Sequence, residues 1–79
     1  MKGEINTMDI VKTMQMKYTI GVLIAKMRKD MELSQEKFGK LFDRTGAIVS
    51  YWEKGLRTPG MVTYRKILDV YNAFLEAKK

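Results

Sequence analysis

The chain of 79 residues contains no cysteine and no histidine. It therefore lacks a disulfide framework, the thiolate and imidazole ligands of zinc sites, and the nucleophile–histidine pairs of hydrolases. Its nine Asp and Glu residues show no paired arrangement beside a basic or metal-binding partner. We therefore expect no enzyme, no metal site and no cofactor.

Long apolar runs and prolines are equally scarce. The longest apolar run, residues 20–25, has six residues, far fewer than the roughly 20 that cross a bilayer. Glu4 and Asp9 stand where a signal peptide has its apolar stretch. The only proline, Pro59, is the main interruption of the chain. These features predict one small cytoplasmic domain with no membrane partner.

Positive charge is in excess, with 15 Lys and Arg against nine Asp and Glu, a formal net charge of +6. A basic balance attracts polyanions through long-range steering and counterion release. A soluble surface with surplus lysines gives the same balance. Charge alone therefore does not decide between a nucleic-acid partner and an ordinary surface.

The first 18 residues are rich in methionine and only loosely patterned. We interpret residues 1–18 as an extension, either an arm or a short helix over residues 9–17. From Thr19, which can cap a helix, the apolar residues recur at spacings of four, three and four. This pattern predicts a helix over about residues 20–31 and a folded domain over residues 19–79.

Two short helices are predicted next. Ser34 is expected to cap a helix over about residues 35–42, and Thr45 to cap one over about residues 45–54. A tight turn at residues 43–44 separates them, because Asp tolerates left-handed backbone. Two short helices joined by such a turn have the dimensions of a helix-turn-helix.

A fourth helix is predicted after the loop at residues 56–60. Its apolar face runs from Tyr64 to Tyr71 at helical spacing. Asn72 can end this helix in a left-handed cap, in which case Phe74 and Leu75 begin a short fifth helix; otherwise they extend the fourth. The predicted fold class is all-α, a small bundle of four to five helices.

Residue identities between Ile20 and Asn72 add to this reading. An ordered set of them has a recognisable pattern: Ile20-Gly21, Ile24, Met27-Arg28, Leu33-Ser34-Gln35-Glu36, Phe38-Gly39, Leu41, Val49-Ser50, Trp52-Glu53-Lys54-Gly55, Arg57 and Pro59. This set resembles the phage-repressor and Cro family of helix-turn-helix regulators. The resemblance implies a lambda-repressor-like fold with a close helix crossing at Gly39, a structural ion pair between Arg28 and Glu53, and Trp52 in the core.

The resemblance also implies a way of binding double-stranded DNA. The third helix would lie in the major groove, and the start of the second would hold a phosphate. The implied base contacts are Thr45, Gly46, Ala47, Ser50 and Tyr51, and the implied phosphate contacts are Gln35, Arg44, Lys54, Arg57 and Thr58. The implied function is a sequence-specific transcriptional regulator, a repressor of phage or mobile-element type that acts as a homodimer.

The chain departs from the family pattern at two places. Gly46 and Ala47 stand where relatives often have hydrogen-bonding side chains. We therefore expect modest base discrimination, with Ala47 touching a thymine methyl and Gly46 permitting close backbone approach. Val22 and Leu23 are apolar where relatives keep polar residues. We expect residues 5–16 or a second protomer to cover them, unless they are ordinary surface residues.

These departures keep a second function open. A helix-turn-helix scaffold can serve protein–protein interaction, as an antitoxin or an antirepressor partner does. Gly46, Ala47 and the extra apolar residues favour such a protein partner. The net charge of +6 and the residues Gln35, Lys54 and Arg57 oppose it.

Overall fold

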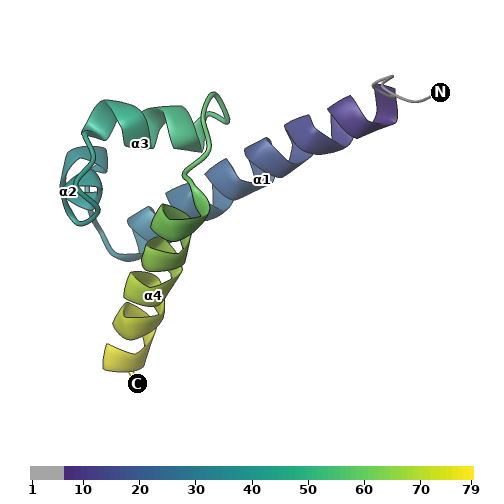
Figure 1. The fold of residues 1–79 in the computed structure, drawn as a ribbon. Helices are drawn as coiled ribbons and strands as arrows, with labels where there is room; N and C mark the ends of the chain where they lie inside the picture. Colours follow the sequence, from purple (N-terminus) through teal and green to yellow (C-terminus); the bar gives the residue numbers. More distant parts are fainter. Residues whose placement is uncertain (1–6) are drawn as a thin grey trace.

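The computed structural model describes residues 7–79, with side chains described at Met16 and from Thr19 onward. This part of the chain folds into four helices and has no strand. The helices are α1 (Thr7–Asp30), α2 (Gln35–Lys40), α3 (Gly46–Glu53) and α4 (Met61–Ala77) (Figure 1). The predicted all-helical fold class is confirmed.

α1 is one uninterrupted helix of 24 residues. The prediction that Thr19 caps a separate helix is wrong, because Thr19 lies inside α1. No proline or glycine occurs in residues 7–20, so nothing in the sequence stops the helix there. The boundary drawn between residues 1–18 and 19–79 therefore falls within a single helix. Figure 1 shows the first half of α1 projecting beyond the other three helices.

Two apolar residues of α1, Val22 and Leu23, are 47% and 43% exposed. The expectation that residues 5–16 fold back over Val22 and Leu23 is wrong for residues 7–16, because these residues continue the axis of α1.

The core lies where the second half of α1 meets α2, α3 and α4. Its buried apolar side chains are Ile24, Met27, Phe38, Phe42, Val49, Trp52 and Ile67. The rings of Phe38 and Phe42 meet edge to face, with centroids 5.1 Å apart. Each of the four helices contributes to this cluster, and Trp52 lies in the core as predicted.

Both short helices begin at the predicted caps. The Ser34 hydroxyl accepts a hydrogen bond from the Lys37 backbone N–H at 3.1 Å. The Thr45 hydroxyl accepts one from the Ile48 backbone N–H at 3.3 Å. α2 ends at Lys40, two residues before the predicted end, and a turn follows in which Asp43 has a φ of 57°.

Gly39 lies at a close approach, but the backbone that approaches it belongs to the turn after α2 and not to the crossing helix that was predicted. A Cβ atom at this position would lie 2.6 Å from the Arg44 carbonyl oxygen and 3.0 Å from that of Thr45. The turn after α2 folds back here, because the Arg44 backbone N–H donates to the Gly39 carbonyl at 2.8 Å. The neighbour that excludes a side chain is therefore the backbone of the turn.

α4 continues to Ala77. Of the two alternatives left open by the sequence, the extension of the helix through residues 74 and 75 is therefore confirmed, and an end at Asn72 is not. Contacts on both sides of Asn72 support this continuation. The rings of Tyr71 and Phe74 stack at 6.2 Å between centroids. The Tyr71 hydroxyl donates to an Asp30 carboxylate oxygen at 2.6 Å, which joins α4 to the end of α1.

Within residues 7–79, none of the helices has the length and apolar character that a membrane-spanning segment requires.

Candidate nucleic-acid interface

One side of α3 faces solvent while the other side is fixed in the core. Val49 and Trp52 are buried. Ala47, Tyr51 and Lys54 are exposed, and Ser50 is half-buried. In sequence order these four positions are three, one and three residues apart, which places them on the same face of the helix. Thr45 is exposed at the start of the helix. α3 therefore presents a continuous face that a groove of a duplex can accommodate.

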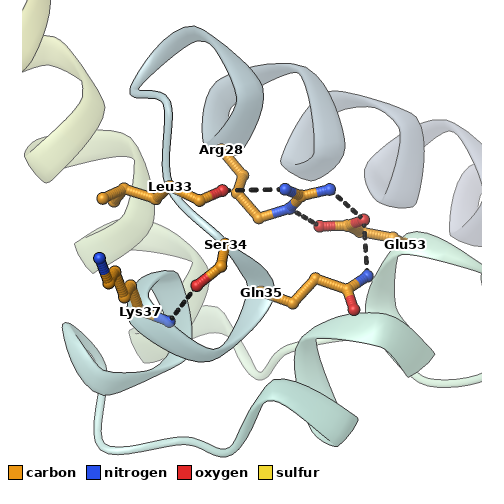
Figure 2. A network of polar contacts seen from close by, with 6 residues as sticks. All are labelled: Arg28, Leu33, Ser34, Gln35, Lys37 and Glu53. Atoms are coloured by element: carbon orange, nitrogen blue, oxygen red, sulfur yellow. Dashed lines mark hydrogen bonds and ion pairs between the residues drawn. The ribbon is translucent and has the colours of Figure 1, made fainter.

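The Arg28–Glu53 ion pair is present and fixes the end of α3 (Figure 2). Arg28 Nε donates to Glu53 Oε2 at 2.6 Å, and its Nη2 donates to Oε1 at 3.1 Å. Its remaining nitrogen, Nη1, donates to the Leu33 carbonyl at 2.9 Å. The hydrogen bonds with Glu53 raise the pKa of the Arg28 guanidinium. With side chains only 14% and 11% exposed, the pair joins α1, α3 and the α1–α2 connection.

Gln35, the predicted phosphate contact at the start of α2, belongs to the same network. Its Nε2 donates to Glu53 Oε1 at 3.1 Å (Figure 2). The amide has a second N–H and a carbonyl oxygen, so the side chain still has groups to offer an external partner. Sequence reasoning missed this contact. One sequence feature pointed to it. Ser34-Gln35 and Glu53-Lys54-Gly55 both belong to the residues that carry the family resemblance, and Glu53 follows Gln35 by eighteen residues.

Gly46 has a packing role that the sequence did not reveal. A Cβ atom there would lie 3.1 Å from the backbone nitrogen of Glu36 and 3.2 Å from its Cα. The space that the missing side chain leaves is therefore occupied by the first turn of α2. The glycine therefore lets the starts of α2 and α3 pack together, and the expected close backbone approach of DNA at Gly46 stays a prediction.

Arg44 is exposed, but its guanidinium already has partners within the chain. Nη1 donates to the carbonyl oxygens of Phe42 and Asp43, each at 3.2 Å. Nη2 donates to the Thr63 hydroxyl at 3.2 Å, which links the turn before α3 to the first turn of α4. Arg44 thus combines an exposed positive charge with a structural role that the sequence did not reveal.

The loop after α3 carries the other predicted basic groups. The Arg57 guanidinium lies over the Tyr51 ring, 5.7 Å from its centroid. The backbone N–H groups of Leu56 and Arg57 both donate to the Tyr51 carbonyl, at 2.9 and 3.3 Å. The exposed residues Lys54 and Thr58 lie in the same segment. The predicted base-contacting tyrosine and the predicted phosphate-contacting cations are therefore neighbours.

A shallow depression marks the opposite end of α3, where it meets α2. It is lined by Glu36, Lys40, Arg44, Thr45, Gly46 and Ala47. Lys40 and Glu36 form an exposed ion pair at 3.7 Å. Lys40 thus adds a cation beside the start of α3 that the sequence pattern had not singled out.

No protein-family model, curated protein or solved structure matches this chain. The described residues hold no cluster of three or more carboxylates suited to a metal ion. The interpretation of the site therefore rests on the residues and geometry given above.

Proposed function

We propose that the protein binds double-stranded DNA as a transcriptional regulator of the repressor or Cro type, with α3 in the major groove. The observation that carries this proposal is the two-sided character of α3. Ala47, Tyr51 and Lys54 are exposed on one side, whereas Val49 and Trp52 are buried on the other. A helix held in this way can lie along a groove without any rearrangement of the core.

The side chains on this face divide into two kinds. Hydroxyl groups at Thr45, Ser50 and Tyr51 can donate to base edges or accept from them, and the Ala47 methyl suits a thymine methyl. None of them offers the bidentate pairing of an Arg or Gln side chain. Base discrimination is therefore modest, and DNA shape supplies part of the sequence preference.

Phosphate contacts surround the face at both ends of α3. Lys54, Arg57 and Thr58 follow its last turn, and Arg44 and Lys40 lie near its start. The Gln35 side chain reaches the end of α3 at Glu53. Together with the net charge of +6, these groups supply the electrostatic part of binding. The regulator acts in the cytoplasm as a homodimer on an inverted repeat, with half-sites about one helical turn apart.

Selection of bound sequences from a random duplex pool tests this function. The expected result is an enriched inverted repeat, bound with an affinity that falls steeply as salt rises. Lys54→Ala should lower the affinity for all sequences and reduce the salt dependence. Lys79→Ala, at the end of α4 that lies away from α3 in Figure 1, removes the same charge and should change binding much less.

One observation favours protein–protein interaction as the second candidate function. Leu56, Met61 and Val62, in and after the α3–α4 loop, are 66%, 91% and 71% exposed. Large apolar groups exposed together are typical of a partner surface. A pool selection without enrichment, and no association with oligonucleotides even at low salt, would contradict DNA binding and support this alternative.

A further inference from the structure

The side chain of Gln35 is held in place before any ligand binds. Gln35 is the first residue of α2, yet its Nε2 donates at 3.1 Å to Oε1 of Glu53, the last residue of α3. A free glutamine side chain samples many rotamers, and fixing it in one of them costs free energy when a partner binds. Here the folded chain already holds the rotamer, so binding through Gln35 avoids that cost.

The same hydrogen bond decides which way the amide faces. A carboxylate only accepts hydrogen bonds, so the amide nitrogen of Gln35, and not its oxygen, must lie next to Glu53. Figure 2 shows the Gln35 oxygen on the side away from Glu53. One N–H of the amide therefore remains for an external acceptor. A side chain that was free to turn over would present its oxygen to the same acceptor in part of the molecules.

Glu53 can hold Gln35 because Arg28 holds Glu53 (Figure 2). Arg28 Nε donates to Glu53 Oε2 at 2.6 Å and Nη2 donates to Oε1 at 3.1 Å, so both carboxylate oxygens are fixed from α1. The guanidinium also compensates the charge of the carboxylate, which would otherwise repel an anionic ligand of the neighbouring amide. The network therefore presents a neutral, oriented N–H donor that an anion can approach.

The chain around this amide favours an anion as its ligand. Glu53 ends α3, and the exposed residues Lys54 and Arg57 follow it. Within the part of the chain that the structure describes, neither of these cations forms an ion pair. A backbone phosphate of DNA carries one negative charge and has only acceptor oxygens. It is therefore matched by one fixed N–H beside cations that have no anionic partner.

From this geometry we infer that Glu53 is a positioning residue for DNA binding, which fixes the Gln35 amide to donate to one backbone phosphate at the end of α3. The inference deepens the proposed function and rests on it, because the phosphate belongs to the duplex that α3 binds. The Arg28–Glu53 pair then has a second role besides joining α1 to α3. Gln35, although it begins α2, acts at the same end of α3 as Lys54.

A double-variant cycle on DNA binding tests the positioning role, with the duplex enriched in the pool selection as the probe. Gln35→Ala should weaken binding about tenfold, because it removes a hydrogen bond to a charged group. Glu53→Gln leaves the Gln35 amide free to turn over, because an amide at position 53 can both donate and accept. It should weaken binding about two- to tenfold in the wild type, but less than about twofold once Gln35 is Ala.

The control for this cycle is Glu36→Gln, which removes the same charge from an exposed carboxylate next to Gln35 in sequence. Its effect should not depend on residue 35. Circular dichroism must show every variant folded at the temperature of the measurement. Equal losses from Glu53→Gln in both backgrounds would show that Glu53 acts only by holding α3 in place. That result would overturn the inference and leave the proposed function standing.

The phosphate itself can be identified on the duplex. Each backbone phosphate is replaced in turn by an uncharged methylphosphonate. One replacement should weaken binding of the wild type much more than binding of Gln35→Ala. Because Gln35 is uncharged, Gln35→Ala should keep the salt dependence of the wild type, whereas Lys54→Ala should reduce the salt slope by about one. A Gln35→Ala variant that responds to every replacement as the wild type does would contradict the contact.

The free protein gives a test that needs no variant. NMR relaxation should show the side-chain amide of Gln35 to be as rigid as the backbone of α3 before DNA is added. The exposed amide of Asn72, which has no hydrogen-bond partner among the described residues, should be mobile. A Gln35 amide as mobile as that of Asn72 would overturn the inference. A rigid Gln35 amide in a protein that binds no duplex would instead contradict the proposed function, and the inference with it.

Discussion

The guanidinium of Arg57 lies over the ring of Tyr51, 5.7 Å from its centroid, and joins the loop after α3 to the exposed face of that helix. The Tyr51 carbonyl also accepts hydrogen bonds from the backbone of residues 56 and 57. The orientation of the tyrosine and the position of the arginine therefore depend on each other. This dependence changes how variants of the two residues are expected to behave.

Taken singly, Tyr51→Ala should relax the sequence preference, whereas Arg57→Ala should weaken binding to all sequences and reduce the salt slope by about one. Because the two side chains are in contact, the double variant should lose less than the sum, with a coupling of about 0.5–1 kcal/mol. Tyr51→Phe keeps the ring beside Arg57 and removes only the hydroxyl. Equilibrium binding of all four variants measures the coupling, and strictly additive losses would contradict it.

Gly39 provides a test of the helix-turn-helix geometry. Gly39→Ala places a methyl 2.6 Å from the Arg44 carbonyl oxygen, and that oxygen belongs to backbone that cannot move alone. We expect a loss of about 1–3 kcal/mol in the free energy of unfolding, measured with denaturant. Gly60→Ser is the contrasting variant. No atom lies within 4 Å of a Cβ at Gly60, and Gly60 caps α4 without a side-chain bond, so stability should stay equal or rise by a few tenths of a kcal/mol. Equal effects of the two variants would contradict the close approach.

Local chemistry explains which parts of this structure could be predicted from the sequence. Ser34 and Thr45 were predicted as caps because a hydroxyl before a short apolar pattern acts on its own first turn. Thr19 has the same hydroxyl, but a cap also requires the preceding residues to leave the helix, and nothing in residues 7–18 makes them do so. Asn72 does not end α4 for a related reason. The rings of Tyr71 and Phe74, which lie on either side of Asn72 in sequence, stack on each other and stabilise the continued helix.

The contacts that the sequence did not reveal are those between helices. The Gln35–Glu53 hydrogen bond joins residues that are eighteen positions apart in sequence. The role of Gly46 depends on where the first turn of α2 lies, which no local pattern specifies. The Arg28–Glu53 pair was predicted only through the resemblance, because composition and periodicity do not select one ion pair among many charges.

The ion-pair network should contribute strongly to stability. Glu53→Ala leaves the half-buried Arg28 guanidinium with only the Leu33 carbonyl, and we expect a loss of about 3 kcal/mol in the free energy of unfolding. Gln35→Ala removes one hydrogen bond and should cost about 1 kcal/mol. Glu36→Ala is the control, because Glu36 is a solvent-exposed partner of Lys40 and such pairs contribute less than about 1 kcal/mol. A Glu53→Ala loss no larger than that of Glu36→Ala would show that the network is not structural.

The junction of α1 and α4 should make stability depend on pH at both extremes. The hydrogen bonds from Lys26 and Tyr71 lower the pKa of Asp30, so the stabilisation from this carboxylate is present above its unfolded pKa of about 3.9. It is lost as the pH falls through the lower value of the folded state. The hydrogen bond to Asp30 raises the pKa of Tyr71, so that contribution is present below about pH 10 and is lost as the pH rises through the folded value. Thermal unfolding of wild type and Asp30→Asn from acidic to alkaline pH measures both effects.

Asp30→Asn should melt at a lower temperature than the wild type near neutral pH, and the difference should shrink below pH 4 as the wild-type carboxylate is protonated. Tyr71→Phe keeps the ring that stacks on Phe74 and removes only the hydroxyl. It should therefore lose the alkaline effect of this tyrosine while most of the acid effect remains, because the Lys26–Asp30 bond at 2.7 Å is still present. A constant difference between Asp30→Asn and wild type at every pH would show that the hydrogen bonds at this junction do not depend on the charge of Asp30.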